Sequence, residues 1–274
     1  MHVVTPPPPA KHGFSLVELS IVLVILGLLV GGVLTGQSLI RAAELRSVTT
    51  EYGKYSTAIR AFKDKYFALP GDMSNATAFW GTAPDCADTA TTAGTGTQTC
   101  NGDGNNNIYA GKEGFRFWQH LANAGLIEGS YTGISGPNSG YWDAIIGTNV
   151  PASRIGNVGW SSVSIVYGND WYFPWIDNTV AAGAYAYKIN QLQMGKKNSI
   201  VWTYGAFLKP EELWNIDTKL DDGKPGVGIV VANNWGSCTD AANATAAATA
   251  SANYRLTSSS IACAIIFMPA GTGL

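Results

Sequence analysis

The first pattern along the chain is a long apolar run near the N-terminus. Between Leu19 and Ile40 the sequence holds no charged residue. A run of this length can span a bilayer as a helix. One carboxylate, Glu18, stands at the start of the run. Because an ionisable group is costly in lipid, its presence there indicates a functional role with a partner charge.

A second pattern follows the run directly. Apolar residues recur at alternating spacings of three and four, which predicts that the same helix continues as an amphipathic one. The helix should end near Leu69, because Pro70-Gly71 cannot continue it. A coiled-coil seam would give a similar pattern, but Gly53 and the aromatic residues favour packing against a sheet. The apolar positions are Leu45, Val48, Tyr52, Tyr55, Ile59, Phe62 and Tyr66.

The remainder of the chain predicts a single soluble domain of the α+β class. It is low in charge and rich in Gly, Thr, Asn, Trp and Tyr, a composition typical of antiparallel strands joined by many turns. Two short helices are expected, over 113–124 and 210–220. The candidate strands are 162–167, 171–175, 184–189, 200–208, 228–232 and 261–268. We therefore expect a long N-terminal helix, membrane-spanning in its first half, packed on an antiparallel β-sheet domain.

The residues before the apolar run narrow its interpretation. A cleavable secretory signal has a shorter apolar core and a small-residue cleavage site, whereas a plain membrane anchor leaves Glu18 unexplained. The segment Gly-Phe-Ser-Leu-Val-Glu-Leu resembles the N-termini of type IV prepilins and of the pseudopilins of type II secretion systems. In those proteins a short basic leader ends in Gly, then comes Phe, and the fifth mature residue is Glu. The matching positions here are Gly13, Phe14 and Glu18.

This resemblance implies a processing and assembly pathway. Prepilin peptidase would cleave after Gly13, the new Phe14 amine would be methylated, and Glu18 would neutralise the amine of a neighbouring subunit in an apolar helical bundle. The alternative for Glu18 is a carboxylate that only reaches the membrane interface. Many pilins carry a proline about a third of the way along this helix. Here glycines stand in that region instead, at Gly27, Gly31, Gly32 and Gly36.

The implied organisation has three parts: a leader over 1–13, a transmembrane and assembly helix over 14–69, and a periplasmic or extracellular pilin-like domain over 70–274. Lys11 is consistent with a cytoplasmic N-terminus. The expected location is the inner membrane, as a single-pass protein, and later a periplasmic or cell-surface filament. The expected partners are other copies or related pilin subunits, prepilin peptidase and the inner-membrane assembly machinery.

Four cysteines fit an oxidising compartment. Cys86 and Cys100 bracket a loop rich in Thr, Ala and Gly, and Cys238 and Cys263 bracket another weakly apolar segment. Sequential pairing is the simplest of three possible connectivities. Each bridge would then stabilise an otherwise loose loop by about 2–4 kcal/mol. Thiolate metal sites are not expected, because no two cysteines have the short spacing of a zinc site.

A loop after Cys100 carries the best candidate for a metal site. Its oxygen-bearing side chains alternate as Ca²⁺ requires, and Ile108 falls where an EF-hand-type loop places its apolar residue. The loop departs from that pattern because Asn106 replaces the usual glycine and the final carboxylate comes one residue late. An Asn/Gly turn with local side-chain caps is the alternative. The candidate ligands for calcium are Asn101, Asp103, Asn105, Asn107 and Glu113.

A second acidic group favours a structural role at the end of a helix and in the following turn, with calcium or a subunit contact as alternatives. It consists of Asp217, Asp221 and Asp222. Enzymatic activity is not expected, because the processed chain keeps one histidine, His120, and shows no nucleophile or phosphate-binding motif. Nucleic-acid binding is not indicated either, because the formal net charge is −2 and the lysines are scattered.

Aromatic residues suggest an alternative function. The chain has nine Trp and twelve Tyr, and aromatic faces flanked by Asn and Asp can hold sugars. A membrane-anchored or filament-tip adhesin with a lectin-like surface is therefore the second hypothesis, although such residues more often fill the core. The candidates are Trp160, Trp171, Tyr172, Trp175, Trp202 and Trp235.

Overall fold

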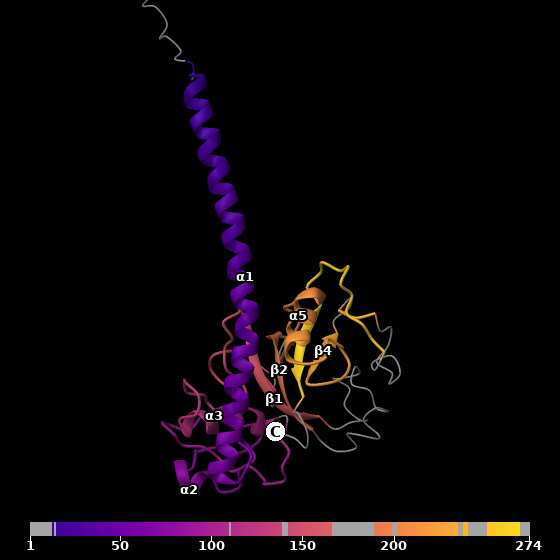
Figure 1. Ribbon diagram of the computed structural model, residues 1–274. Coiled ribbons are helices and arrows are strands. Elements are labelled where there is room, and N and C mark those ends of the chain that lie inside the picture. The colour runs from indigo at the N-terminus through magenta and orange to yellow at the C-terminus, as the bar shows by residue number, and fades with distance from the viewer. Residues whose placement is uncertain are drawn as a thin grey trace, which may run out of the picture. The chain divides into compact units, whose positions relative to one another are not determined.

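The structure is a computed structural model that describes residues 13, 15–109, 111–138, 142–165, 189–198, 202–234, 238–240 and 251–268. The chain divides into two compact units, Met1–Glu44 and Leu45–Leu274. One helix, α1 (Leu16–Tyr66), contributes its first part to the first unit and its second part to the other (Figure 1). The single long helix predicted from the two apolar patterns is confirmed.

The second part of α1 packs on the sheet of its own unit, as the apolar stripe predicted. Along the stripe, Val48, Tyr55, Ile59 and Phe62 are buried, and the other three members pack against the core while partly exposed. Tyr52 stacks on Phe267 with ring centroids 4.3 Å apart. These contacts with a strand confirm sheet packing and exclude the coiled-coil alternative for this face.

The end of α1 differs slightly from the prediction. The helix ends at Tyr66, before the expected Leu69, because Phe67 takes a left-handed conformation with φ 53°. The N–H of Phe67 still donates to the carbonyl of Lys63 at 2.8 Å, so Phe67 stands where glycine usually closes a helix. Its ring is 94% exposed.

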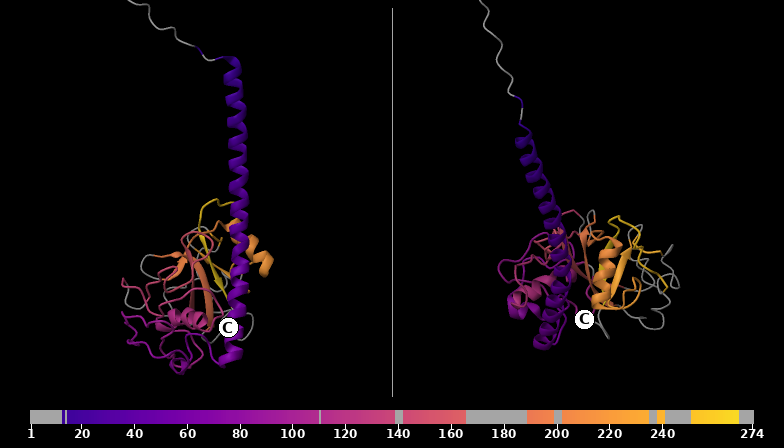
Figure 2. Two further views of the ribbon diagram at one scale, coloured as in Figure 1. Left: turned by 90° about the vertical axis from the view of Figure 1, so that its left-hand side faces the viewer. Right: turned by 45° about the horizontal axis from the view of Figure 1, so that its top comes forward.

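The sheet is antiparallel and has five strands, which confirms the α+β class. They are β1 (Val158–Ile165), β2 (Ile189–Lys197), β3 (Thr203–Gly205), β4 (Val230–Asn234) and β5 (Cys263–Phe267). The order is β1-β2-β5-β4, and β3 pairs with β2. In this register Trp160, Met194, Leu192 and Phe267 share one face. The further views in Figure 2 show the strands beside the second half of α1.

The strand bounds show where sequence patterns were insufficient. Four of the strands fall within or overlap the predicted segments 162–167, 200–208, 228–232 and 261–268. β2 begins at Ile189, the last residue of the predicted strand 184–189, and continues to Lys197. The absence of a predicted strand over 190–197 was therefore an error. The polar Gln191 and Gln193 alternate with Leu192 and Met194 in β2, yet all four side chains are buried. The predicted strand 171–175 and residues 184–188 lie outside the described residues.

In the described part of the chain, three short helices accompany α1 and the sheet. α5 (Pro210–Leu220) has the predicted bounds, with Pro210 in its first turn. The carboxylate of Glu212 accepts a hydrogen bond from the N–H of Lys209 at 2.9 Å, which satisfies a free donor at the helix start. α2 (Ala76–Trp80) was not predicted. α3 (Lys112–Asn123) lies within one residue of its predicted bounds at either end.

α3 is buried along most of its length, and its polar side chains bind the surrounding loops. Every residue from Glu113 to Leu121 is buried. The guanidinium of Arg116 donates to the carbonyls of Cys86 and Asn101, each at 3.1 Å. Since a buried guanidinium needs such acceptors, these two carbonyls are tied to the position of α3.

His120 in α3 joins three segments. Its Nδ1 accepts a hydrogen bond from the N–H of Gly71 at 3.0 Å, so the neutral ring carries its proton on Nε2. Nε2 then donates to Thr99 Oγ1 at 3.0 Å, and that hydroxyl donates to Gln119 Oε1 at 2.6 Å. Burial, followed by the charge of Arg116, lowers the pKa of His120 to about 3. His120 is therefore a neutral core residue.

Both disulfides follow the simplest connectivity. Cys86 pairs with Cys100 and Cys238 with Cys263, with Cα–Cα distances of 5.6 Å and 5.2 Å. The second bridge attaches the residues near 238 to β5. The first closes the loop that precedes α3.

Candidate functional site

The N-terminal segment is built around a capped helix start. The hydroxyl of Ser15 accepts a hydrogen bond from the N–H of Val17 at 3.3 Å, and the carboxylate of Glu18 accepts one from the N–H of Ser15 at 2.8 Å. Gly13 and Glu18 are exposed, while Phe14 lies outside the described residues. Glu18 therefore has a partner within its own chain, at the positive end of the helix.

This capping role was missed from the sequence, although the signal was present. Ser15-Leu16-Val17-Glu18 has the Ser-x-x-Glu spacing of a capping box directly before an apolar run. A carboxylate that caps its own helix is a local reason for Glu18, independent of other subunits. The predicted pairing of Glu18 with a neighbour's amine stays a prediction.

The apolar run presents its side chains outward. The large apolar residues from Leu16 to Ile40 have exposed fractions between 50% and 85%. By length and composition, α1 is the one helix in the described part of the chain that could cross a membrane. An exposed surface of this size requires lipid or other protein around it.

A group of carboxylates forms the second candidate site. Asp72, Asp103 and Glu113 each place an oxygen within 4.8 Å of the others. Asp72 and Glu113 are buried and Asp103 is exposed. Asp72 comes from the turn after α1, Asp103 from the loop after Cys100, and Glu113 from α3. Asp72 was not among the predicted ligands, because nothing local in the sequence places it near the other two.

Glycines allow these segments to approach closely. Gly71 has φ 84°, and a Cβ there would lie 2.4 Å from the carbonyl oxygen of Glu113. A Cβ on Gly102 would lie 2.3 Å from the main chain of Asp72. The N–H of Gly102 donates to the carbonyl of Met73 at 2.9 Å. Only glycine fits at positions 71 and 102. The close approach of the main chains at these two glycines therefore brings the segments that carry the three carboxylates together.

Main-chain N–H groups surround the two buried carboxylates. Asp72 accepts two of them, at 3.0 Å and 2.9 Å, and Glu113 accepts two at 3.1 Å and 2.7 Å. The donors are Asn105 and Asn106 for Asp72, and Asp103 and Tyr109 for Glu113. Burial raises the pKa of Asp72 to about 6, with further contributions from Asp103 and Glu113. Burial likewise raises the pKa of Glu113.

The structure brings together two of the predicted calcium ligands, and the amide oxygens of two others accept main-chain N–H groups. Asp103 and Glu113 meet in the cluster. The amide oxygen of Asn101 accepts from the N–H of Thr77 at 2.9 Å, and that of Asn105 accepts from the N–H of Asn107 at 2.8 Å. Two of the predicted amide ligands thus already accept main-chain N–H groups, and binding of calcium by the predicted set stays a prediction.

The acidic group after α5 is tied into the fold. Asp217 is buried and accepts hydrogen bonds from the hydroxyl of Tyr254 at 2.7 Å and the N–H of Gly223 at 3.2 Å. Asp221 accepts one from the N–H of Ile229. Burial raises the pKa of Asp217 to about 7, and the nearby charges of Asp222 and Asp221 add to the rise. These contacts agree with the structural role predicted for the group.

The described aromatic candidates do not form a sugar-binding face. Trp160 and Trp202 are buried in the core, at 0% and 5% exposed. Trp202 stacks on Phe115 of α3 with ring centroids 5.3 Å apart. The expectation of a lectin-like surface is therefore wrong for these two residues. The other four candidates, Trp171, Tyr172, Trp175 and Trp235, lie outside the described residues.

Comparison with known proteins supports the interpretation of the N-terminus. A family model described as the prokaryotic N-terminal methylation motif matches residues 8–34. No curated protein and no solved structure matches the chain significantly. The matched residues include Gly13, Phe14 and Glu18 together with the first part of the exposed apolar helix. The chain thus carries the prepilin-type cleavage and methylation segment of type IV pilins and pseudopilins.

Proposed function

We propose that this chain is a structural subunit, a pilin or a pseudopilin, of a type IV filament system. Prepilin peptidase cleaves it after Gly13, and it polymerises with other copies or related subunits through its N-terminal helix. The observation that carries the proposal is the methylation motif at residues 8–34, joined to a helix whose apolar side chains are exposed from Leu16 to Ile40. Before assembly the subunit resides in the inner membrane with its N-terminus in the cytoplasm.

Glu18 has two consecutive partners in this proposal. In the isolated chain its carboxylate caps the helix through the N–H of Ser15. Within a filament it pairs with the methylated amine of Phe14 on a neighbouring subunit. The exchange favours assembly because an amine left unpaired among apolar helices would cost several kcal/mol.

Processing is tested by mass. The full chain is co-expressed with a prepilin peptidase in the presence of membranes, and its intact mass is measured. Loss of residues 1–13 and gain of one methyl group are expected. A chain that keeps its leader would overturn the proposal. A Gly13→Val variant is the matched control, because a side chain at the cleavage position should block the same mass change.

Assembly is tested with two variants that separate charge from capping. Glu18→Gln removes the carboxylate charge, and Ser15→Ala removes the capping hydroxyl while keeping that charge. Filament fractions from cells that express the remaining assembly components are probed for each variant. Only Glu18→Gln should be excluded. Equal incorporation of both variants, or equal loss of both, would show that the charge of Glu18 has no separate role.

The carboxylate cluster supports a second and independent proposal, a calcium site formed by Asp72, Asp103 and Glu113. Within the described part of the chain, none of these three forms an ion pair. A hard divalent cation would compensate the charges that burial disfavours.

Calcium at a hundred times its Kd should stabilise the fold by about 2.7 kcal/mol relative to chelator. Asp103→Asn should reduce that gain, and Asp64→Asn, at an exposed position of α1, should not. An unchanged melting temperature with calcium ends the proposal.

A further inference from the structure

The two disulfides differ in their exposure to solvent. Cys238 and Cys263 are both fully buried, and Cys100 is 3% exposed. Cys86, in contrast, is an exposed residue. Thiol–disulfide exchange begins when an external thiolate reaches one sulfur of the bond, so exposure decides which bridge reacts first. Cys86–Cys100 thus includes one exposed cysteine, whereas both cysteines of the other bridge are buried.

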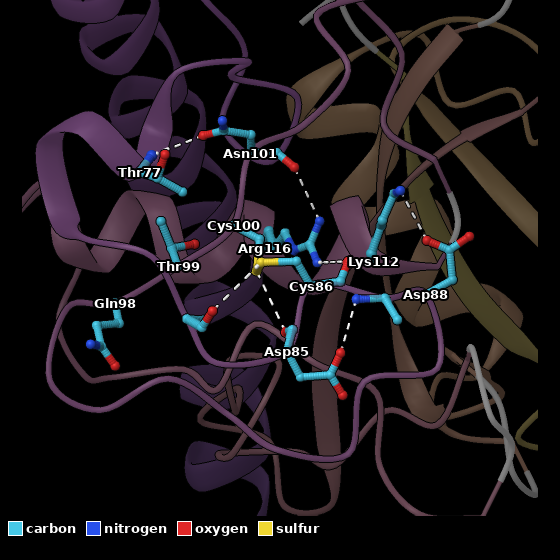
Figure 3. Close-up of a disulfide and its surroundings, with 12 residues drawn as sticks. Thr77, Asp85, Cys86, Asp88, Gln98, Thr99, Cys100, Asn101, Lys112 and Arg116 are labelled. Carbon is cyan, nitrogen blue, oxygen red and sulfur yellow. Dashed lines mark hydrogen bonds and ion pairs between the residues drawn. A yellow bond between two sulfur atoms is a disulfide. The ribbon is translucent and has the colours of Figure 1, made fainter.

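Contacts other than the disulfide hold the loop that Cys86–Cys100 closes mainly at its Cys100 end, where the amide of Gln119 donates to the carbonyl of Gln98 at 3.1 Å and Thr99 binds His120 at 3.0 Å. Most residues between the two cysteines are exposed, and the loop has almost no apolar side chains. Lys112 of α3 forms an ion pair with Asp88 at 2.9 Å. Arg116 binds the carbonyl of Cys86 on one side and that of Asn101 on the other (Figure 3). The disulfide thus joins the two chain segments whose carbonyls bind this one guanidinium.

The same helix also holds the carboxylate cluster. Glu113 lies one turn before Arg116 in α3 and accepts the N–H groups of Asp103 and Tyr109. The segment 100–109 thus begins at the disulfide, binds Arg116 through the carbonyl of Asn101, and binds Glu113 through the N–H groups of Asp103 and Tyr109. Asp103 follows Cys100 by three residues, and the residue before it, Gly102, donates its N–H to the carbonyl of Met73 at 2.9 Å.

We infer that Cys86–Cys100 is a redox-sensitive closure, which a dithiol reductant opens selectively and whose opening loosens residues 101–109 around the carboxylate cluster. Selective opening of this bridge is independent of the proposed filament function.

The reaction is a two-electron exchange. One thiolate of the dithiol attacks Sγ of Cys86, the Cys86–Cys100 bond breaks, and Sγ of Cys100 leaves as a thiolate. The second thiol of the reductant then attacks the reductant sulfur that is bonded to Cys86, which closes a disulfide within the reductant and releases Sγ of Cys86 as a thiolate. The reductant is oxidised to its disulfide, and the protein gains two electrons and two protons.

A graded reduction of the full chain in detergent tests the order of opening. The protein is incubated with increasing dithiothreitol under native conditions, alkylated, and digested for mass spectrometry. When half of Cys86 and Cys100 is alkylated, less than about a tenth of Cys238 and Cys263 should be. Simultaneous opening of the two bridges, or earlier opening of Cys238–Cys263, would overturn the inference.

Hydrogen exchange of the selectively reduced protein tests the coupling. The N–H groups of Asp103, Asn105 and Tyr109, which are bonded to the buried carboxylates, should exchange about tenfold faster than in the oxidised protein. The N–H groups of β5 next to Cys263 serve as the internal control and should not change. Unchanged exchange at residues 103–109 refutes the coupling. A Cys86→Ser/Cys100→Ser variant should reproduce the reduced state, and the wild-type measurement stands if that variant does not fold.

Discussion

The carboxylate of Glu51 accepts a hydrogen bond from the indole N–H of Trp160, with 2.7 Å between Oε2 and Nε1. Its other oxygen accepts the N–H of Arg154 at 3.0 Å. Trp160 is fully buried in β1, where its N–H needs an acceptor. The carboxylate of Glu51, on the second part of α1, thus accepts one N–H donor from the sheet and one from the loop before β1.

Replacement of Glu51 by Ala should therefore destabilise the fold. The substitution leaves a buried indole N–H without its acceptor, and hydrogen bonds to charged groups contribute about 1.5–3 kcal/mol. Thermal unfolding of the full chain in detergent, followed by tryptophan fluorescence, measures the loss. Arg60→Ala, at an exposed position of the same helix, should change stability by less than about 0.5 kcal/mol. Similar losses for the two variants would contradict the role given to Glu51.

Phe67→Gly should stabilise the protein. The left-handed backbone at Phe67 costs a residue with a Cβ about 1 kcal/mol, and a ring that is 94% exposed gains little from burial. A rise of about 1 kcal/mol in the free energy of unfolding is expected for the isolated chain. A substantial loss instead would show that the ring makes a stabilising contact.

His120 should make the fold sensitive to acid. Its pKa is about 3 in the fold and about 6.5 in an unfolded chain. Between these values only the unfolded chain binds the proton, so stability from this group is complete above pH 6.5 and declines as the pH falls towards 3. The slope is at most about 1.4 kcal/mol per pH unit. His120→Gln, which does not titrate, should show a smaller decline between pH 6.5 and 4. Parallel curves for the two proteins would refute this assignment.

Asp217 should have the opposite dependence on pH. Its pKa is about 7 in the fold against an ordinary value of 3.8. The folded state therefore favours the protonated form, so stability from this group is complete below pH 3.8 and is lost as the pH rises through 7. Asp217→Asn keeps an acceptor for Tyr254 and should exceed the wild type in stability at pH 8, with the difference shrinking towards pH 4. Melting temperatures across this range measure it, with Asp64→Asn as an exposed control; a constant difference would contradict the raised pKa.

The features that the sequence could predict depend on local signals. The apolar run and stripe of α1 give its position and face, and Pro210 with Glu211 and Glu212 gives the start of α5. The disulfide pairing followed from the spacing of the cysteines and the weak loops between them. Such signals act within a few turns of the chain.

The features that it could not predict depend on contacts distant in sequence. β2 buries Gln191 and Gln193, so its alternation of polar and apolar residues does not mark a buried face. Asp72 meets Glu113 because glycine at positions 71 and 102 permits close approach of three segments. The calcium ligands predicted from the segment 101–113 therefore omitted Asp72, which the fold brings to the cluster from the turn after α1.

The buried polar side chains of α3 have a consequence for how this protein can vary. Arg116 and Glu113 bind main-chain carbonyl and N–H groups of the loops, and not their side chains. His120 binds the main-chain N–H of Gly71 and, as the one loop side chain in this set, the hydroxyl of Thr99. Every amino acid except proline supplies the same main-chain groups. Outside the glycines, the cysteines and Thr99, these loops can change composition, and so the surface they offer to other molecules, while the helix beneath them continues to specify one path for the chain.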